Sequence, residues 1–384
     1  MEIALAHHSL NIPGGAERLC LAVVEALQQK GHAVSLVTVE KTDWRIVEKN
    51  FGKITMPTHE VYLTKNRFSR DLASIRVSST YFLAFIMQLL AMKVREKYDL
   101  TINTFGDVVD SIADVTYVHF PLRAAVRFSQ IPAFSDKSSW YLVAPFYEVA
   151  AKTLDKINPG ELLTNSKFMQ GIIREILCRR SLVVYPPVDT ETFSSQCSKG
   201  QKSKPTVVVV ASYTPKRHLE QVPLIAKHAT NAKFVVMGKA DEYSLAILRR
   251  LHDMIHKLHV EDRVELLTNV PFAEFARILS EAKVYLHVMP YDHFGISVVE
   301  AMASGCVPVV HRSGGPWLDI LDGQQGKYGF SYTSAKEAAE SIDTLVIDED
   351  LRSKIASKAL IRAKEFDQAV FKQKIVEVVE KIAG

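Results

Sequence analysis

Runs of apolar residues alternate with amphipathic segments along the whole chain. Residues 2–6 have the pattern of a buried strand, and after a glycine-containing turn an amphipathic segment continues to Gly31, a residue type that often ends helices. Residues 32–39 are again strand-like. A strand, a helix and a strand in this order form a βαβ unit, whose crossover requires a parallel sheet covered by helices. The pattern therefore predicts an α/β fold class.

The same alternation continues and then starts again after a polar segment, which predicts two doubly wound domains with parallel sheets. In the first half, further strands are expected at residues 100–103, 115–120 and 161–166. Residues 194–205 are polar and poor in large apolar side chains, as linkers are. Beyond them we expect strands at 206–212, 233–238, 263–268, 284–290 and 307–312, and helices that include 272–282 and 296–304.

These patterns predict a specific domain organisation. We expect an N-terminal Rossmann-like domain over residues 1–193, a linker at 194–205 and a second Rossmann-like domain over 206–365. Residues 366–384 form an amphipathic helix that could pack back on the N-terminal domain. Open sheets of this kind bind ligands beyond the carboxyl ends of their strands, so function is expected in the turns between strands and helices.

The composition is that of a folded protein and narrows the function classes. The 384 residues include 47% hydrophobic and 23% charged residues, and the formal net charge of +4 is too small for bulk nucleic-acid affinity. The four cysteines lie far apart and form no zinc-ligand pattern, and the N-terminus lacks the features of a signal peptide. The longest apolar stretch, residues 81–92, is too short to cross the roughly 30 Å hydrocarbon core of a membrane. We expect a cytoplasmic protein without a nucleic-acid partner.

Two turns carry candidate chemistry. The turn after the first strand contains Gly14 and Gly15, which would let backbone N–H groups approach an anion or a sugar, although such glycines also simply make tight turns. In the second half, Asp292 precedes a turn with Gly295, and Glu300 lies in the helix that follows. The N–H groups of a helix start suit a phosphate, and carboxylates accept hydrogen bonds from vicinal diols. This combination indicates a nucleotide-sugar site; a capping Asp292 and a solvated Glu300 are the alternative.

Several segments together resemble glycosyltransferase family 4, whose members are retaining enzymes of GT-B architecture with two Rossmann-like domains: GGAE, YVHFP, VVYPPVD and DHFGISVVEAMASG. More narrowly, residues 117–121, 183–193, 292–305 and 313–321 resemble the family's α-1,2-mannosyltransferases, which act on dolichol-pyrophosphate oligosaccharide at the cytosolic membrane face. The family carries Glu, seven residues, Glu, whereas this chain has Asp292 in the first place and Glu300 in the second. The Asp side chain is shorter by one methylene group. This departure affects the expected contact of residue 292 with the donor sugar, and it does not affect the contact of Glu300 with the ribose.

The resemblance assigns roles to the matching residues. Glu300 would accept hydrogen bonds from the ribose hydroxyls of the nucleotide, and Asp292 would hold hydroxyls of the donor sugar. His119 matches the family's active-site histidine near the donor sugar, whereas the residue pattern alone favours a histidine of the core. With Asp292, the backbone of the next residues would hold the sugar and the diphosphate: His293, Phe294, Gly295, Ile296 and Ser297.

The departing nucleoside diphosphate builds up negative charge, which this architecture stabilises with side chains and helix dipoles rather than with a metal. The family places an Arg and a Lys after the first strand of the second domain. In this chain the Arg position falls on Ser212 and the Lys position on Arg217 or Lys216, and Lys239 is a further candidate. The resemblance also implies front-side attack, in which the departing phosphate takes the acceptor proton. We therefore expect no metal, no cofactor and no nucleophilic triad.

The sequence predicts a retaining glycosyltransferase that moves mannose from GDP-mannose onto a lipid-linked glycan, with α-1,2 linkage. The alternatives are a relative that uses a UDP-sugar to build a polysaccharide or glycolipid, and a catalytically silent nucleotide-sugar-binding subunit. On the acceptor side, residues 62–95 hold six basic residues and one acidic residue around the apolar stretch 81–92. Such a segment suits the anionic surface of a membrane, on whose cytosolic face the protein would lie peripherally; a buried helix with solvated ends is the alternative.

Overall fold

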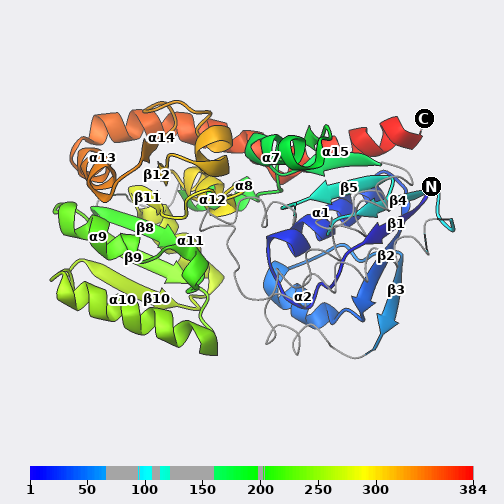
Figure 1. Ribbon diagram of the computed structural model, residues 1–384, viewed down its shortest axis with the longest axis horizontal. Helices are drawn as coiled ribbons and strands as arrows, with labels where there is room; N and C mark the ends of the chain where they lie inside the picture. Colours follow the sequence, from blue (N-terminus) through cyan, green and yellow to red (C-terminus); the bar gives the residue numbers. More distant parts are fainter. Residues whose placement is uncertain are drawn as a thin grey trace. The chain divides into compact units, whose positions relative to one another are not determined.

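The computed structural model describes residues 1–65, 94, 96–105, 113–121, 160–197, 202 and 204–383. The chain divides into two compact units, one formed by Met1–Pro187 together with Gln368–Gly384, and the other by Val188–Asp367. Each unit contains one sheet of parallel strands with helices packed against it (Figure 1). The predicted α/β class with two doubly wound parallel-sheet domains is confirmed.

The first unit has a sheet with the strand order β3-β2-β1-β4-β5-β6-β7. Its strands are β1 (Glu2–Ala6), β2 (Ala33–Glu40), β3 (His59–Thr64), β4 (Leu100–Asn103), β5 (Val115–Val118), β6 (Glu161–Thr164) and β7 (Leu182–Val183). Its described helices are α1 (Gly15–Gln29), α2 (Trp44–Phe51), α7 (Lys167–Leu177) and α15 (Gln368–Ala383). Strands β1, β2, β4 and β5 are almost entirely buried, as expected for strands covered on both faces. Strands β3 and β7 were not predicted.

The C-terminal helix α15 belongs to the first unit, where it packs against α1. Phe371 and Ile375 of α15 share a buried cluster with Leu19 and Val23 of α1. At the edge of this contact, Nζ of Lys372 lies 2.6 Å from a carboxylate oxygen of Glu25. The chain therefore returns to its first unit after completing the second.

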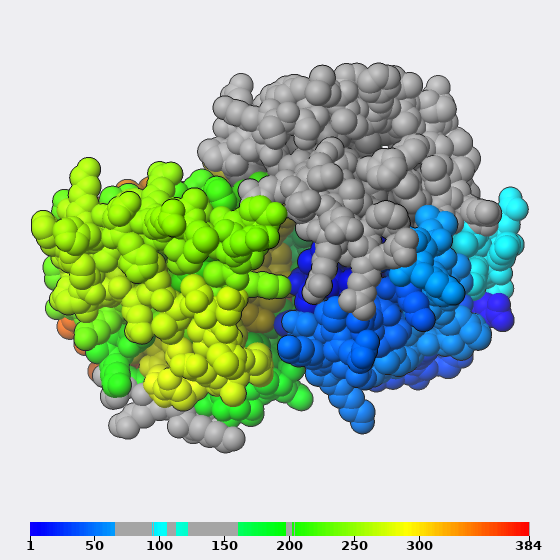
Figure 2. Space-filling view, turned by 90° about the horizontal axis from the view of Figure 1, so that it is seen from below, coloured from blue at the N-terminus to red at the C-terminus, as the bar shows by residue number. Residues whose placement is uncertain are grey.

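The second unit has a sheet with the strand order β10-β9-β8-β11-β12-β13. Its strands are β8 (Thr206–Val210), β9 (Lys233–Gly238), β10 (Val264–Thr268), β11 (Val284–His287), β12 (Val307–His311) and β13 (Phe330–Tyr332), of which β13 was not predicted. Its longer helices are α8 (Thr190–Cys197), α9 (Gln221–His228), α10 (Leu245–Lys257), α11 (Phe272–Glu281), α12 (Ile296–Ala303), α13 (Ala335–Ile347) and α14 (Glu349–Ala363). Helix α10, yellow-green in Figure 2, lies at the surface of this unit and buries Ile247, Leu251 and Ile255 toward the sheet.

The expected linker at residues 194–205 needs a correction, because its first part is helical. Helix α8 extends to Cys197, and Asp189 caps its start by accepting hydrogen bonds from the backbone N–H and the hydroxyl of Thr192. The ring of Phe193 lies edge-on to Phe272 of α11 with ring centroids 5.9 Å apart, and α8 also contacts α12. One buried aromatic residue thus holds a polar segment on the second unit, and the chain leaves the first unit at Pro187, before the expected linker.

Within the described part of the chain, no helix is long and apolar enough to cross a membrane. Of the basic residues expected at a membrane surface, Lys65 is described, whereas Arg67, Arg70, Arg76, Lys93 and Arg95 lie outside the described residues together with the apolar stretch 81–92. The expected membrane contact therefore stays a prediction.

Candidate functional site

The predicted donor-site residues of the second unit gather where its strand order reverses. Strand β8 lies between β9 and β11, so the connections that follow β8 and β11 leave the sheet at adjacent positions. Ligands of open α/β sheets bind beyond the carboxyl ends of the strands at such a reversal. Ser212, Lys216 and Arg217 follow β8, and residues 292–297 follow β11. The structure therefore brings these two predicted groups to one edge of one sheet.

The loop that leads into α12 adopts a conformation that requires glycine. Gly295, the residue before the helix, has φ of +95°, and a Cβ atom there would lie 3.0 Å from Cγ of Pro316. The preceding Phe294 is buried and lies edge-on to Phe366, with ring centroids 5.5 Å apart. At the start of α12, the hydroxyl of Tyr285 donates a 2.7 Å hydrogen bond to Oγ of Ser297. The helix start is thus fixed by contacts on several sides.

A second glycine turn supports the backbone of the same loop. The N–H of Gly315 donates a 2.8 Å hydrogen bond to the carbonyl oxygen of Asp292. A Cβ atom added at Gly314 would lie 2.4 Å from the carbonyl oxygen of Asp292. A Cβ atom added at Gly315 would lie 2.4 Å from the carbonyl oxygen of His293. Gly314 also has φ of +71°. The resemblance included this segment without giving it a role; the structure shows that it positions the backbone of Asp292 and His293.

Asp292 is paired with a histidine that the sequence analysis did not single out. Nε2 of His287, the last residue of β11, lies 3.0 Å from Oδ2 of Asp292, and both side chains are largely buried. Burial by itself would raise the pKa of Asp292, but the imidazole of His287 and the guanidinium of Arg217 hold this pKa well below its ordinary value. Asp292 is therefore ionised at neutral pH, which fits an acceptor of hydrogen bonds.

Of the candidate cations, Arg217 is the one whose charge lowers the pKa of this carboxylate. Its guanidinium is half-buried, donates to Sδ of Met289 at 3.1 Å and lowers the pKa of both Asp292 and His293 through its charge. Burial is the main cause of the lowered pKa of His293, so its ring is neutral at physiological pH. Lys216 is exposed at the neighbouring position. The geometry favours Arg217 over Lys216 as the cation at this edge.

The two remaining candidates after β8 and β9 are placed differently. Ser212 is partly buried, and its carbonyl oxygen accepts a hydrogen bond from the N–H of Thr214 within the turn. Lys239 is exposed just beyond β9, and its carbonyl oxygen accepts a hydrogen bond from the N–H of Tyr213. Among the described residues, no contact links the side chain of Ser212 or of Lys239 to Asp292. Their roles therefore stay predictions.

Glu300 lies on α12 and is buried, with 8% of its surface exposed. Its charge and that of Asp292 both raise the pKa of Tyr285, although burial is the main cause of that rise. The hydroxyl of Tyr285 is therefore within electrostatic reach of both carboxylates. The alternative of a solvated Glu300 on an open helix face is excluded.

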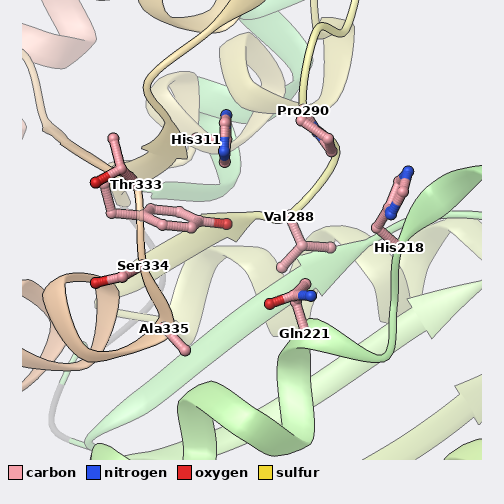
Figure 3. A pocket seen from close by; sticks show the side chains of 9 residues that line it. His218, Gln221, Val288, Pro290, His311, Thr333, Ser334 and Ala335 are labelled. Carbon is pink, nitrogen blue, oxygen red and sulfur yellow. The ribbon is translucent and has the colours of Figure 1, made fainter. Parts of the chain in front are cut away.

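A pocket of about 190 Å³ opens beside this loop, at the carboxyl ends of β8, β11, β12 and β13. In Figure 3, His218 and His311 lie on different sides of it, and Val288 lies between them. The lining residues are His218, Gln221, Val288, Pro290, His311, Tyr332, Thr333, Ser334 and Ala335. This lining is rich in hydrogen-bonding groups and contains no carboxylate.

The other predicted site residues belong to the first unit. His119 follows β5, where its Nε2 lies 3.0 Å from the carbonyl oxygen of Thr104 and its own carbonyl oxygen accepts a 2.9 Å hydrogen bond from Asn165. Gly14 and Gly15 are exposed at the start of α1. All three lie at the carboxyl edge of the first sheet, because each follows a strand that runs in the same direction.

A model of the family described as glycosyl transferases group 1 matches residues 191–362. The chain is 30% identical over 451 residues to a GDP-Man:Man(3)GlcNAc(2)-PP-Dol alpha-1,2-mannosyltransferase of Neurospora crassa, in an alignment that covers 99% of this chain and 79% of the relative. The human protein of the same name is 27% identical over 439 residues, covering 100% of this chain and 87% of that protein. The chain belongs to the group 1 glycosyltransferases.

Solved structures agree with the fold of this glycosyltransferase. HepE of Anabaena in complex with UDP superposes with a TM-score of 0.73 at 19% identity, covering 99% of this chain and 100% of HepE. Sucrose-phosphate synthase of Thermosynechococcus elongatus gives a TM-score of 0.72 at 14% identity, covering 100% and 99% of the two chains. The predicted GT-B architecture and the predicted resemblance are confirmed.

Proposed function

We propose that this glycosyltransferase transfers mannose from GDP-mannose to a lipid-linked oligosaccharide and forms an α-1,2 linkage. The observation that carries the proposal is the alignment along 99% to 100% of the chain with relatives named for that reaction. The relatives' printed name specifies GDP-mannose as donor and a dolichol-pyrophosphate-linked glycan as acceptor. The site of the second unit supplies the groups that such a donor needs.

In this proposal the two carboxylates have different tasks. Glu300, buried on α12, accepts hydrogen bonds from the ribose hydroxyls of the nucleotide. Asp292 is held on one oxygen by His287, and its other oxygen accepts a hydrogen bond from a hydroxyl of the mannose. The pairing fixes the shorter aspartate side chain in one orientation, so that little conformational entropy is lost when the donor binds.

The diphosphate lies against the start of α12, where backbone N–H groups and the helix dipole favour an anion. Arg217 provides a positive side chain whose charge already acts on Asp292 and His293, and Lys216 adds charge from the exposed side of the turn. As the bond to the leaving GDP breaks, these groups stabilise the growing negative charge on the phosphate. We propose that this donor site works without a metal ion or a cofactor, and that the departing phosphate accepts the proton of the attacking hydroxyl.

We also propose that the protein binds peripherally to the cytosolic face of a membrane, because its acceptor carries a lipid. The charge pattern of residues 62–95 supports this, since each basic residue near an anionic surface contributes about 1 kcal/mol. Flotation with liposomes of neutral lipid and of neutral plus anionic lipid tests the contact. Binding that increases with anionic lipid supports it, and absence of lipid-dependent binding rejects it.

A donor panel tests the reaction. Purified protein is given GDP-mannose, UDP-glucose or UDP-N-acetylglucosamine with a lipid-linked mannosyl acceptor, and transfer is measured by the mass of the product. Transfer from GDP-mannose alone supports the proposal. Transfer from a UDP-sugar would support the alternative donor, and neither transfer nor donor hydrolysis by folded protein would support a silent binding subunit.

A further inference from the structure

The first unit contains a buried group of three metal-ligating side chains that the donor site does not use. His7 and His8 follow β1, and Glu17 lies in the first turn of α1. One ligand atom from each residue lies within 4.8 Å of those of the other two. The exposed fractions of the side chains are 0% for His7, 13% for His8 and 8% for Glu17. Polar groups that are buried together in this way need a hydrogen-bond partner or an ion to offset the loss of water.

The hydrogen bonds around His7 indicate which of its nitrogens carries the proton. The hydroxyl of Thr104 donates to the carbonyl oxygen of Ala6 at 3.2 Å, so its oxygen is left to accept from Nδ1–H of His7, which lies 3.0 Å away. Neutral His7 then has a bare lone pair on Nε2. This atom is buried and makes no hydrogen bond, and Nδ1 of His8 is also buried without a hydrogen-bond partner.

The bare Nε2 of His7 faces another electron-pair donor. It lies 3.5 Å from Oε1 of Glu17, and Nε2 of His8 lies 4.0 Å from the same oxygen. A carboxylate has no proton to donate and the neutral ring of His8 carries only one, so acceptors outnumber donors in this group. A cation placed among them satisfies all three at once. We propose that His7, His8 and Glu17 bind a divalent transition-metal ion of the zinc class.

The distances support an ion rather than a larger ligand. With zinc bonds of about 2.0–2.1 Å, a tetrahedral site places its ligand atoms about 3.3 Å apart. The observed 3.5 Å and 4.0 Å exceed that spacing by about 0.2 Å and about 0.7 Å, which the three side chains close as they turn toward the ion. Two histidines and one glutamate form the donor set of open zinc sites, in which a fourth position is left for water or a substrate oxygen.

The surroundings hold the three side chains in place. Thr104 fixes the ring of His7, as an outer hydrogen-bond partner does for a metal-bound histidine. The ring of Phe105 lies against that of His8 with centroids 3.9 Å apart, which keeps this side of the group apolar. A Cβ atom at Gly14 would lie 2.7 Å from Oε2 of Glu17, so the glycine leaves room for the carboxylate. The glycine turn thus has a use beyond a tight bend.

The test measures metal binding directly and does not depend on transferase activity. Full-length protein is stripped of metal and titrated with Zn²⁺ by calorimetry and with Co²⁺ by visible absorption. We expect one tightly bound ion per chain, with Co²⁺ bands typical of nitrogen and oxygen ligands. His8→Gln and Glu17→Gln each weaken binding at least tenfold, and Thr104→Val weakens it about 10- to 100-fold by freeing the His7 ring.

Two controls keep the outcome decisive. His59→Gln removes an exposed histidine of β3 and leaves the affinity unchanged. Circular dichroism shows which variants are folded, and Thr104→Val and Glu17→Gln still decide the question if His8→Gln does not fold. If the parent and the folded variants bind the ion equally well, it is an adventitious ion only, and the proposal is overturned. Absence of binding by the folded parent protein overturns it as well.

Discussion

Nε2 of His287 lies 3.0 Å from Oδ2 of Asp292, and this pair joins the end of strand β11 to the loop that leads into α12. Aspartate stands here where the family carries glutamate, so its carboxylate reaches one methylene less far. We expect the histidine to compensate by holding the shorter side chain in one orientation. Because the folded-state pKa of Asp292 lies below its ordinary value, the pair stabilises the fold at neutral pH, and this stabilisation is lost as the pH falls toward the folded-state pKa.

His287→Gln therefore changes the pH dependence of transfer. Without the imidazole, burial raises the pKa of Asp292, so the carboxylate becomes protonated at a higher pH than in the parent. The acid limb of kcat/KM against pH should move upward in this variant. Asp292→Asn should have a low rate at every pH, and its kcat/KM should show no acid limb. An unchanged acid limb in His287→Gln would show that the pair does not control the carboxylate.

Removing the carboxylate of Glu300 should weaken donor binding. A hydrogen bond to a charged group contributes about 1.5–3 kcal/mol, so Glu300→Ala should lower donor affinity about 10- to 100-fold and remove most of the transfer rate. Glu300→Gln keeps one oxygen acceptor and should lose less. Glu340→Gln, an exposed glutamate on α13, is the matched control. Near-normal turnover of Glu300→Ala would count against the ribose contact.

Arg217 and the adjacent Lys216 can be separated by one pair of variants. Arg217 acts on Asp292 and His293 through its charge, whereas Lys216 is exposed. Arg217→Met should reduce the affinity for GDP about tenfold or more, and Lys216→Met should reduce it less. Calorimetric titration with GDP measures both, and a larger loss in Lys216→Met would reverse the assignment.

The glycine turn behind the loop should be sensitive to a single added methyl group. Gly314→Ala places a Cβ atom 2.4 Å from the carbonyl oxygen of Asp292 at a φ of +71°, so the loop must move. Gly323 also has positive φ, of +63°, but a Cβ atom there meets nothing within 4 Å. Gly323→Ala should cost only the left-handed backbone strain of about 1–2 kcal/mol. Thermal unfolding should show a larger loss of stability in Gly314→Ala than in Gly323→Ala. GDP titration should show weaker binding in Gly314→Ala and unchanged binding in Gly323→Ala.

The long buried strands and the amphipathic helices could be predicted from the sequence, because continuous apolar runs mark strands covered on both faces. Strand β3 was missed because its positions alternate between exposed and half-buried and its sequence includes His59 and Glu60. Strand β13 has only three residues, too few for a pattern. Helix α8 was taken for a linker because its stability comes from Phe193 packing on α11, a contact that local composition does not reveal.

In the candidate site, the sequence motifs singled out the residues of the loop after β11 but not the side chains that they contact. His287 ends an apolar strand five positions before Asp292, and only the sheet geometry turns its ring toward that carboxylate. The choice between Lys216 and Arg217 likewise depends on which side chain the turn directs inward. His7, His8 and Glu17 match no familiar metal-ligand spacing, because they meet through the βα turn rather than along one element.

The proposed reaction, transfer of mannose from GDP-mannose in α-1,2 linkage at the second unit's candidate donor site, can be tested directly. The most direct measurement incubates the purified parent protein and Glu300→Ala with GDP-mannose and a lipid-linked mannosyl acceptor, then digests the product with a linkage-specific α-1,2-mannosidase. We predict a product that the mannosidase shortens by the added sugar, and little product from Glu300→Ala. A mannosidase-resistant product, transfer from UDP-sugars instead, or equal product from both proteins would contradict the account.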